Sequence, residues 1–179
     1  MQLRIIAGNL RGRWFDAPRG KRTHPMGEKV RGALFNVLGD ISGMSVLDCY
    51  AGSGALGFEA ISRGASNVLF IENDKTAHAT INHTIDVLGV KRQAQAIRAN
   101  VTGWSASNIA KQFNIVLCDP PYDAILASTI EKIARHVAVG GVLVLSWPAH
   151  VDIPEILGMQ AIKNKTYAAA TLVFYQKSG

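Results

Sequence analysis

The sequence predicts an α/β fold, in which helices cover both faces of a mostly parallel sheet. Apolar strand-like segments alternate with segments of helical period, and a glycine-rich turn joins the first of these strands to its helix. The chain has 179 residues, of which 48% are hydrophobic and 18% charged. Such a composition fits one globular domain with a full core.

The elements are expected in the following order. A short hairpin comes first, formed by "LRIIA" and "RWFDA" around "GNLRG", and a helix follows from about Glu28 to Leu38. Strands are then predicted at "MSVLDCY", "NVLFIE", "AQAIRAN", "NIVLCD" and "GGVLVLSWP", with two more in "MQAIKNKTYAAATLVFYQKSG". Helices are predicted at "ALGFEAISRG", from Asp74 to Leu88, and after Asp123 with the face Leu126, Ile130, Ile133 and Val137. The composition shifts near residue 40, which divides the chain into a basic extension, residues 1–40, and an α/β domain, residues 41–179.

Several function classes are disfavoured by what the sequence lacks. No apolar run approaches the ~20 residues of a membrane span, and the first residues do not have the charged-then-apolar pattern of a secretion signal. Cys49 and Cys118 form neither a disulfide framework nor a metal cluster, and the five histidines show no metal-ligand spacing. We therefore expect a cytoplasmic protein without a bound metal, whose two thiols are buried and reduced.

The charge of the chain is concentrated near its N-terminus. Residues 1–31 hold eight basic side chains against two acids, which accounts for the entire formal net charge of +6. A basic arm on a neutral body indicates a polyanionic partner, and Trp14 and Phe15 among the bases can stack on unpaired nucleobases. The alternative is a solvated basic surface with Trp14 packed inward. The residues expected to contact nucleic acid are Arg4, Arg11, Arg13, Arg22 and Arg31.

The turn after the first strand of the domain has the pattern G-x-G-x-x-G, from Gly52 to Gly57, and it opens a helix. The next strand ends at Glu72, 20 residues beyond Gly52. Glycines let a ligand approach the backbone, and an acid at the end of the second strand can accept hydrogen bonds from ribose hydroxyls. The alternatives are a plain tight turn and an ordinary exposed strand end. By itself the pattern fits a nicotinamide dinucleotide as well as S-adenosylmethionine.

Asp48 favours S-adenosylmethionine. It lies at the end of the first strand, four residues before Gly52, in the mouth of the turn. A carboxylate at this place repels a pyrophosphate and attracts ammonium and sulfonium groups. The alternative is an acid that caps the loop by accepting hydrogen bonds from local N–H groups.

The stretch Asp119-Pro120-Pro121-Tyr122 follows an apolar strand. Each proline fixes its own φ and holds the residue before it extended. We expect the Asp119 carboxylate and the Pro120 carbonyl to accept the two N–H groups of a nucleobase amine while Tyr122 stacks on the base. This would align the nitrogen with a sulfonium methyl, so that positioning and electrostatic stabilisation supply the catalysis. The alternative is a turn that merely ends the strand.

"DPPY" after an apolar strand resembles the [D/N]-P-P-[F/Y/W] motif of amino-methyltransferases. Together with "RIIAGNLRGR", "THPMGEKVRGALFN", "VLDCYAGSGALGFEAISRGA" and "FIENDKTA", it resembles the bacterial 16S rRNA (guanine-N2)-methyltransferase family over essentially the whole chain. The resemblance implies a Rossmann-like class I methyltransferase with a seven-stranded sheet, an antiparallel last strand and a small N-terminal extension for RNA. It implies methyl transfer from S-adenosylmethionine to N2 of a guanine in 16S rRNA or in the assembling small ribosomal subunit. We expect the protein to act as a monomer.

The resemblance also implies the site residues. The methyl donor would lie on the loop from Asp48 to Gly54, with its ribose at Glu72 and its adenine near Asn100 and Val101. The cofactor-binding set is Asp48, Ala51, Gly52, Ser53, Gly54, Glu72, Asn73, Asn100 and Val101. The catalytic set is Asp119, Pro120, Pro121 and Tyr122.

The chain departs from the usual pattern at three places, of which one is Gly32, inside the predicted helix from Glu28 to Leu38, where a larger residue is usual. His24-Pro25-Met26 stands where many members have Arg-Pro-Thr, and Asn100 stands where an acid is expected, although its amide can still accept from the adenine amine. The open alternatives are a methyltransferase acting on DNA adenine or on a protein glutamine, and a non-catalytic RNA-binding protein with this fold. The glutamine enzymes usually carry Asn before the two prolines. The intact set from Asp119 to Tyr122 argues against a non-catalytic protein.

Overall fold

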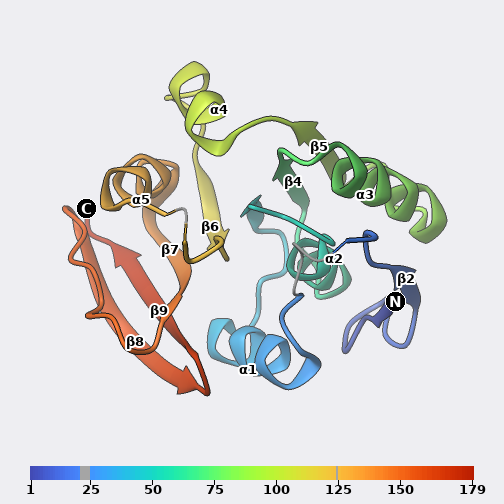
Figure 1. The fold of residues 1–179 in the computed structure, drawn as a ribbon, viewed down its shortest axis with the longest axis horizontal. Coiled ribbons are helices and arrows are strands. Elements are labelled where there is room, and N and C mark those ends of the chain that lie inside the picture. The colour runs from blue at the N-terminus through green and yellow to red at the C-terminus, as the bar shows by residue number, and fades with distance from the viewer. Residues whose placement is uncertain (21–24, 124) are drawn as a thin grey trace.

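The computed structural model describes residues 1–20, 25–123 and 125–179. Its centre is a seven-stranded sheet with the strand order β5-β4-β3-β6-β7-β9-β8 (Figure 1). The strands are β3 (Ser45–Cys49), β4 (Asn67–Glu72), β5 (Ala94–Arg98), β6 (Phe113–Cys118), β7 (Val137–Pro148), β8 (Met159–Tyr167) and β9 (Ala170–Lys177). The neighbours from β5 to β7 pair in parallel, whereas β9 runs antiparallel to both β7 and β8. The predicted fold class, with its antiparallel last strand, is confirmed.

Helices cover both faces of the sheet, and each face has its own apolar core. The helices of one face are α1 (Glu28–Leu38), α2 (Ala55–Ser62) and α3 (Lys75–Leu88), and those of the other are α4 (Val101–Ser107) and α5 (Ala127–Ala134). Because side chains alternate along a strand, neighbouring residues of β3 serve different cores. Val46 belongs to the core that contains Phe58 of α2, whereas Leu47 belongs to the core that contains Trp104 of α4.

The N-terminal extension forms the predicted hairpin of β1 (Gln2–Arg4) and β2 (Trp14–Asp16) and is packed onto α2. Its connecting loop approaches the end of α2 so closely that a Cβ on Gly8, which has φ +85°, would lie 1.9 Å from the carbonyl oxygen of Ser62. Phe15 is buried, and its ring centroid lies 5.6 Å from that of Phe58. The extension therefore shares the core of the α/β domain.

Two local expectations are corrected. Val137 does not continue the face of α5; it begins β7 and pairs with Phe113. Spacing alone cannot separate the end of a helix face from a buried strand residue that follows it. The short helix α4 was not predicted, because Gly103 and only two buried apolar residues, Val101 and Trp104, leave little helical period.

Two features are absent from the described residues, namely a helix that could span a membrane and a cluster of side chains that could hold a metal ion. None of their helices is long and apolar enough to cross a membrane. They also contain no group of three or more His, Cys, Asp or Glu side chains placed to hold a metal ion. Cys49 and Cys118 are free and buried on adjacent strands, and burial raises the pKa of the Cys118 thiol.

Candidate active site

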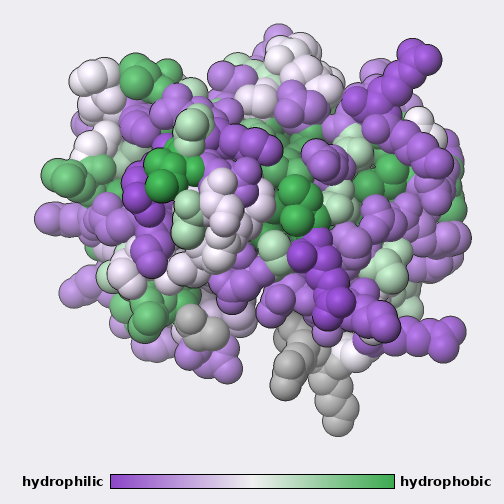
Figure 2. All heavy atoms as spheres, turned by 90° about the horizontal axis from the view of Figure 1, so that it is seen from above, coloured by the Kyte–Doolittle hydropathy of each residue, from purple (hydrophilic) through white to green (hydrophobic). Residues whose placement is uncertain are grey.

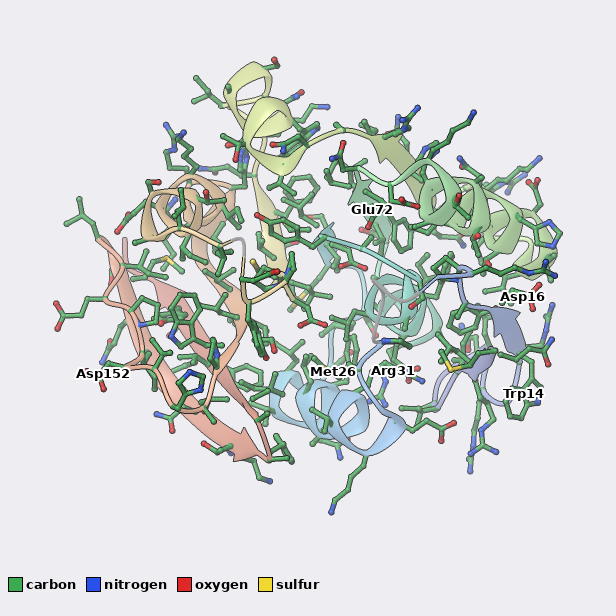
Figure 3. The ribbon with its side chains drawn as sticks, viewed as in Figure 1. Trp14, Asp16, Met26, Arg31, Glu72 and Asp152 are labelled. Carbon is green, nitrogen blue, oxygen red and sulfur yellow. The ribbon has the colours of Figure 1, made fainter. Side chains whose placement is uncertain are left out.

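The candidate active site lies where the parallel strands end at one edge of the sheet. The strand order reverses at β3, because β4 lies on one side of it and β6 on the other. Open α/β sheets bind ligands at such a topological switch point. A cleft of about 1000 Å³ opens there. Its lining includes Tyr50, Gly52, Glu72, Asn73, Asn100, Val101, Asp119 and Pro121. Figure 3 shows Glu72 beside α3 at this edge. Residues predicted from four separate parts of the chain thus share one cleft.

The turn between β3 and α2 needs its glycines for two different reasons. Gly52 and Gly54 have φ of +58° and +80°, in the left-handed region that favours glycine, and Gly54 begins α2 as its N-cap. Gly57 has ordinary helical geometry, but a Cβ there would lie 2.2 Å from the ring of Phe70 on β4. The first two glycines shape the loop, and the third lets the helix pack closely on the sheet.

Asp48 is buried, and its carboxylate holds the start of α2. The N–H of Gly57 donates to Oδ2 of Asp48 at 3.0 Å. Burial raises the pKa of Asp48 well above its usual range, in spite of this hydrogen bond, and the charges of Asp119 and Glu72 raise it further. The capping role considered as an alternative is therefore present in the structure. Asp48 also lines a small cavity together with Asp119.

Glu72 joins the turn after β3 to the start of α3. Its Oε2 accepts from the N–H of Gly52 at 2.7 Å, and its Oε1 accepts from the N–H of Asp74 at 2.8 Å. Each oxygen keeps a second lone pair, and the carboxylate lines the cleft. Glu72 is therefore more than an ordinary exposed strand end, because it fixes the loop that a donor would contact.

Asn100 is the N-cap of α4. Its Oδ1 accepts from the N–H groups of Thr102 at 2.9 Å and Gly103 at 3.4 Å. The oxygen expected to accept from an adenine amine is thus already engaged with the helix, which leaves the side-chain NH₂ as its free hydrogen-bonding group. Val101 is buried under the same side of the cleft.

The Asp-Pro-Pro-Tyr stretch lies after β6, across the cleft from the glycine turn. Burial raises the pKa of Asp119, while the Ser146 hydroxyl opposes that rise. The hydroxyl of Tyr122 forms a hydrogen bond of 2.8 Å with the same Ser146 hydroxyl, and the Tyr122 side chain is 40% exposed. Pro120 is buried, whereas Pro121 is exposed at the cleft. The tyrosine ring is thus both anchored and open to a ligand.

Two residues of this site were missed by sequence reasoning. Ser146 lies on β7, and its only signal is that a hydroxyl interrupts the apolar run "GGVLVLSWP". Tyr50 has φ +55°, a conformation that is rare for a side chain of this size, and it lines both cavities. Such strain gathers at functional sites and cannot be read from a pattern of hydrophobicity.

A second, smaller cavity of about 90 Å³ lies between the glycine turn that follows β3 and the segment just before α1. Asp48 and Asp119 line it, together with Ala51 and Ser53 of the glycine turn. Its remaining wall includes Pro25 and Met26, which come from the segment just before α1. The departure from the family pattern at His24-Pro25-Met26 therefore falls partly on the wall of a cavity that Asp48 and Asp119 also line, although His24 lies outside the described residues.

The predicted nucleic-acid residues have different surroundings. Arg4 pairs with Glu28 at 2.9 Å and lies 5.5 Å above the ring of Trp14. Arg11 and Arg13 are exposed, and Arg13 donates to a main-chain carbonyl of α3 at 3.1 Å. Trp14 is 53% exposed, so the alternative in which it packs inward is wrong. Figure 3 shows Trp14 on the hairpin. In Figure 2, which looks down on the side of α3 and α4, the surface at the α3 end is mostly hydrophilic. Arg22 lies outside the described residues.

Arg31 is a correction to this set, because its side chain is only 1% exposed. Its Nη1 donates to the carbonyl of Met26 at 3.0 Å, and its Nη2 donates to the carbonyl of Arg4 at 2.6 Å. Its Nε lies 3.8 Å from Oε2 of Glu59, a fully buried acid on α2. A guanidinium enclosed in this way is unavailable to RNA. This burial could not be predicted from the local sequence, because Glu59 is 28 residues away from Arg31.

The comparisons with known proteins agree with this geometry. A family model described as "Conserved hypothetical protein 95" matches residues 3–176. "Putative rRNA methyltransferase YlbH" of Bacillus subtilis is 30% identical over 184 residues, which cover 99% of this chain and 100% of that protein. Ribosomal RNA small subunit methyltransferase D of Haemophilus influenzae is 36% identical over 133 residues, 70% of this chain and 67% of that protein.

A solved structure described as "Putative methyltransferase yhhF from Escherichia coli" superimposes with a TM-score of 0.90 at 30% identity, covering 99% of each chain. The match includes the N-terminal hairpin as well as the sheet, since it spans nearly all of both chains. The chain belongs to the Conserved hypothetical protein 95 family and is a relative of the ribosomal RNA small subunit methyltransferases.

Proposed function

We propose that this protein transfers a methyl group from S-adenosylmethionine to the exocyclic N2 amine of a guanine in 16S rRNA, free or within the assembling small ribosomal subunit. The observation that carries the proposal is that Asp119 and Pro121 line the same cleft as Gly52 of the glycine turn and Glu72. The relationship to rRNA methyltransferases over the length of the chain supports the substrate class.

The residues present fit the methyl donor. The turn at Gly52 leaves its backbone open to a ligand, and Glu72 keeps lone pairs for ribose hydroxyls. Asp48 lines the small cavity on the acceptor side of that turn, where a cationic group is favoured. When bound, S-adenosylmethionine supplies an electrophilic methyl group on a sulfonium. Ala51, Ser53, Asn73, Asn100 and Val101 complete the proposed donor set.

On the acceptor side, the Asp119 carboxylate would accept one N–H of the guanine amine and the Pro120 carbonyl the other. The lone pair of this amine is delocalised into the ring, so two acceptors that favour a pyramidal nitrogen make it a better nucleophile. The raised pKa of Asp119 suits a carboxylate that also takes up the proton as the nitrogen becomes positive. Tyr122, held by Ser146, would stack on the base.

The target guanine must be unpaired or flipped, because a paired amine lies within the helix stack and cannot reach the cleft. Arg4, Arg11 and Arg13 are the proposed RNA contacts on the hairpin, with Trp14 exposed between them. Arg22 remains a proposed contact from the sequence alone.

The proposal is tested by incubating the purified protein with labelled donor and, separately, unmodified 16S transcript, small subunits, duplex DNA and protein substrates. Nucleoside mass spectrometry should find N2-methylguanine in the ribosomal RNA, and the Asp119→Ala variant should give none above background. Label in N6-methyladenine or in a protein glutamine would assign the enzyme to another substrate class. A protein that binds RNA but transfers no label to any acceptor would be the non-catalytic alternative.

A further inference from the structure

We propose that Arg31 is a positioning residue, which holds the Met26 wall of the reaction cavity in place and ties it to the N-terminal hairpin. This inference rests on the proposed methyl transfer for its effect on rate. The contacts themselves are a property of the folded chain and can be tested without any substrate.

The two terminal nitrogens of Arg31 donate hydrogen bonds to the main chain of two separate segments. One terminal nitrogen donates to the carbonyl of Met26 at 3.0 Å, and the other donates to the carbonyl of Arg4, the last residue of β1, at 2.6 Å. Figure 3 shows Met26 and Arg31 next to each other above α1. A single buried side chain therefore connects the segment before α1 with the hairpin.

Both connected segments face sites that the proposed reaction needs. Met26 lines the cavity of about 90 Å³ that Asp48 and Asp119 also line, so a shift of the Met26 main chain would move one wall of that cavity. The side chain of Arg4 lies over the exposed ring of Trp14 on the face proposed to meet RNA. Arg31 can therefore hold the Met26 wall of the cavity at a constant distance from the hairpin surface that carries Arg4 and Trp14.

The chemistry of the cluster argues for a positioning role over simple packing. Burying a guanidinium is unfavourable unless it is paired, and here burial lowers the pKa of Arg31 while the carboxylate of Glu59 opposes that effect. The Nε of Arg31 has no hydrogen-bond acceptor and lies 3.8 Å from Glu59. The ion pair thus supplies the compensating charge, and the two terminal nitrogens are left to hold the carbonyls. The planar fork of arginine donates to the two carbonyls from two separate nitrogens, whereas a lysine ammonium would have to donate from a single nitrogen.

Arg63 provides a matched control within the same cluster. Its Nε donates to Oε1 of Glu59 at 2.9 Å, and its guanidinium lies 5.0 Å from the ring of Phe35. Among the described residues, the side chain of Arg63 forms no hydrogen bond with Met26 or Arg4. Arg63→Lys should therefore disturb the pairing of Glu59 without releasing the cavity wall.

The experiment uses the ¹³C-labelled methyl groups of methionine, of which the chain has four. Arg31→Lys should shift or broaden the Met26 methyl signal and should lower kcat for methyl transfer by about tenfold to a hundredfold, because small misplacements at a reacting centre are costly. The Kd for the donor should stay within about threefold of the wild-type value. Arg63→Lys should leave both the Met26 signal and kcat close to wild type.

The proposal is overturned if Arg31→Lys leaves the Met26 signal in place, or if both lysine variants lower kcat equally at matched melting temperature. Arg31→Met, which keeps an unbranched apolar stem and removes the fork, should reproduce the effect if Arg31→Lys unfolds. A wild-type protein that methylates no RNA would refute the proposed function instead, while the Met26 signal would still decide whether Arg31 holds the cavity wall.

Discussion

Glu72 offers the sharpest test of the donor site, because its carboxylate both fixes the glycine turn and faces the cleft. Glu72→Ala removes the acceptor of the Gly52 N–H at 2.7 Å and of the Asp74 N–H at 2.8 Å. A hydrogen bond to a charged group contributes about 1.5–3 kcal/mol, and the half-exposed position of Glu72 lets water replace part of the two that are lost. We expect Glu72→Ala to lower the free energy of unfolding by about 2–3 kcal/mol.

Donor affinity should fall because the same carboxylate is proposed to accept from the ribose. Losing that charged hydrogen bond should weaken S-adenosylmethionine binding by about 1.5–3 kcal/mol, which is roughly tenfold to 150-fold in Kd. Glu72→Gln should not restore binding, because its NH₂ would face one of the two backbone N–H donors. Titration calorimetry with the donor and with S-adenosylhomocysteine measures both variants.

Asp74→Ala is the control for Glu72. Asp74 lines the same cleft and carries the same charge, but its Oδ1 caps α3 by accepting from the N–H of Ala77 at 2.8 Å. Removing it should lower stability by about 1 kcal/mol and leave donor Kd within about threefold. A donor Kd unchanged in Glu72→Ala, or weakened as much in Asp74→Ala, would refute the assignment of the ribose to Glu72. Binding of NADH in the micromolar range would refute the donor itself.

Four further predictions concern the acceptor, the RNA surface and the pH response. Asp119→Ala should lower kcat by two or more orders of magnitude with donor Kd unchanged, as single-turnover kinetics would show. Tyr122→Phe should cost less than about threefold in rate and Tyr122→Ala about tenfold or more, since the ring supplies stacking; equal losses would contradict this. Replacing Arg11 and Arg13 with Ala should weaken RNA binding and reduce its salt slope by about 1.4 in filter-binding assays, whereas an unchanged slope would leave them as solvated surface. Burial lowers the pKa of His136 from its ordinary 6.5, so the stability that its neutral form contributes is full above that value and is lost as pH falls below it. The melting-temperature advantage of wild type over His136→Gln should therefore shrink from about pH 8 to about pH 5.

The sequence was a good guide wherever the deciding interactions are local. The hairpin, the helix α1 and the glycine turn follow from periodicity and turn chemistry within a few residues, and the structure has them where they were expected. The strand ends that carry Asp48, Glu72 and Asp119 could also be placed in advance, since an α/β sheet brings the carboxyl ends of its parallel strands to one edge. The sequence therefore predicted that these three side chains lie at one edge of the sheet, but it did not predict the shape of the cleft between them.

Tertiary structure alone decided which role each polar side chain takes. Arg11 and Arg31 look alike in a basic stretch, yet Arg11 is exposed, whereas Arg31 is enclosed by Glu59 and by the carbonyls of Met26 and Arg4. Ser146 forms a hydrogen bond with Tyr122, 24 residues away in the sequence, and Met26 lines a cavity with Asp48 and Asp119, which lie in other parts of the chain. The physical reason is that periodicity records which face of an element is apolar, whereas the partner of a buried polar group is set by how separate elements pack together.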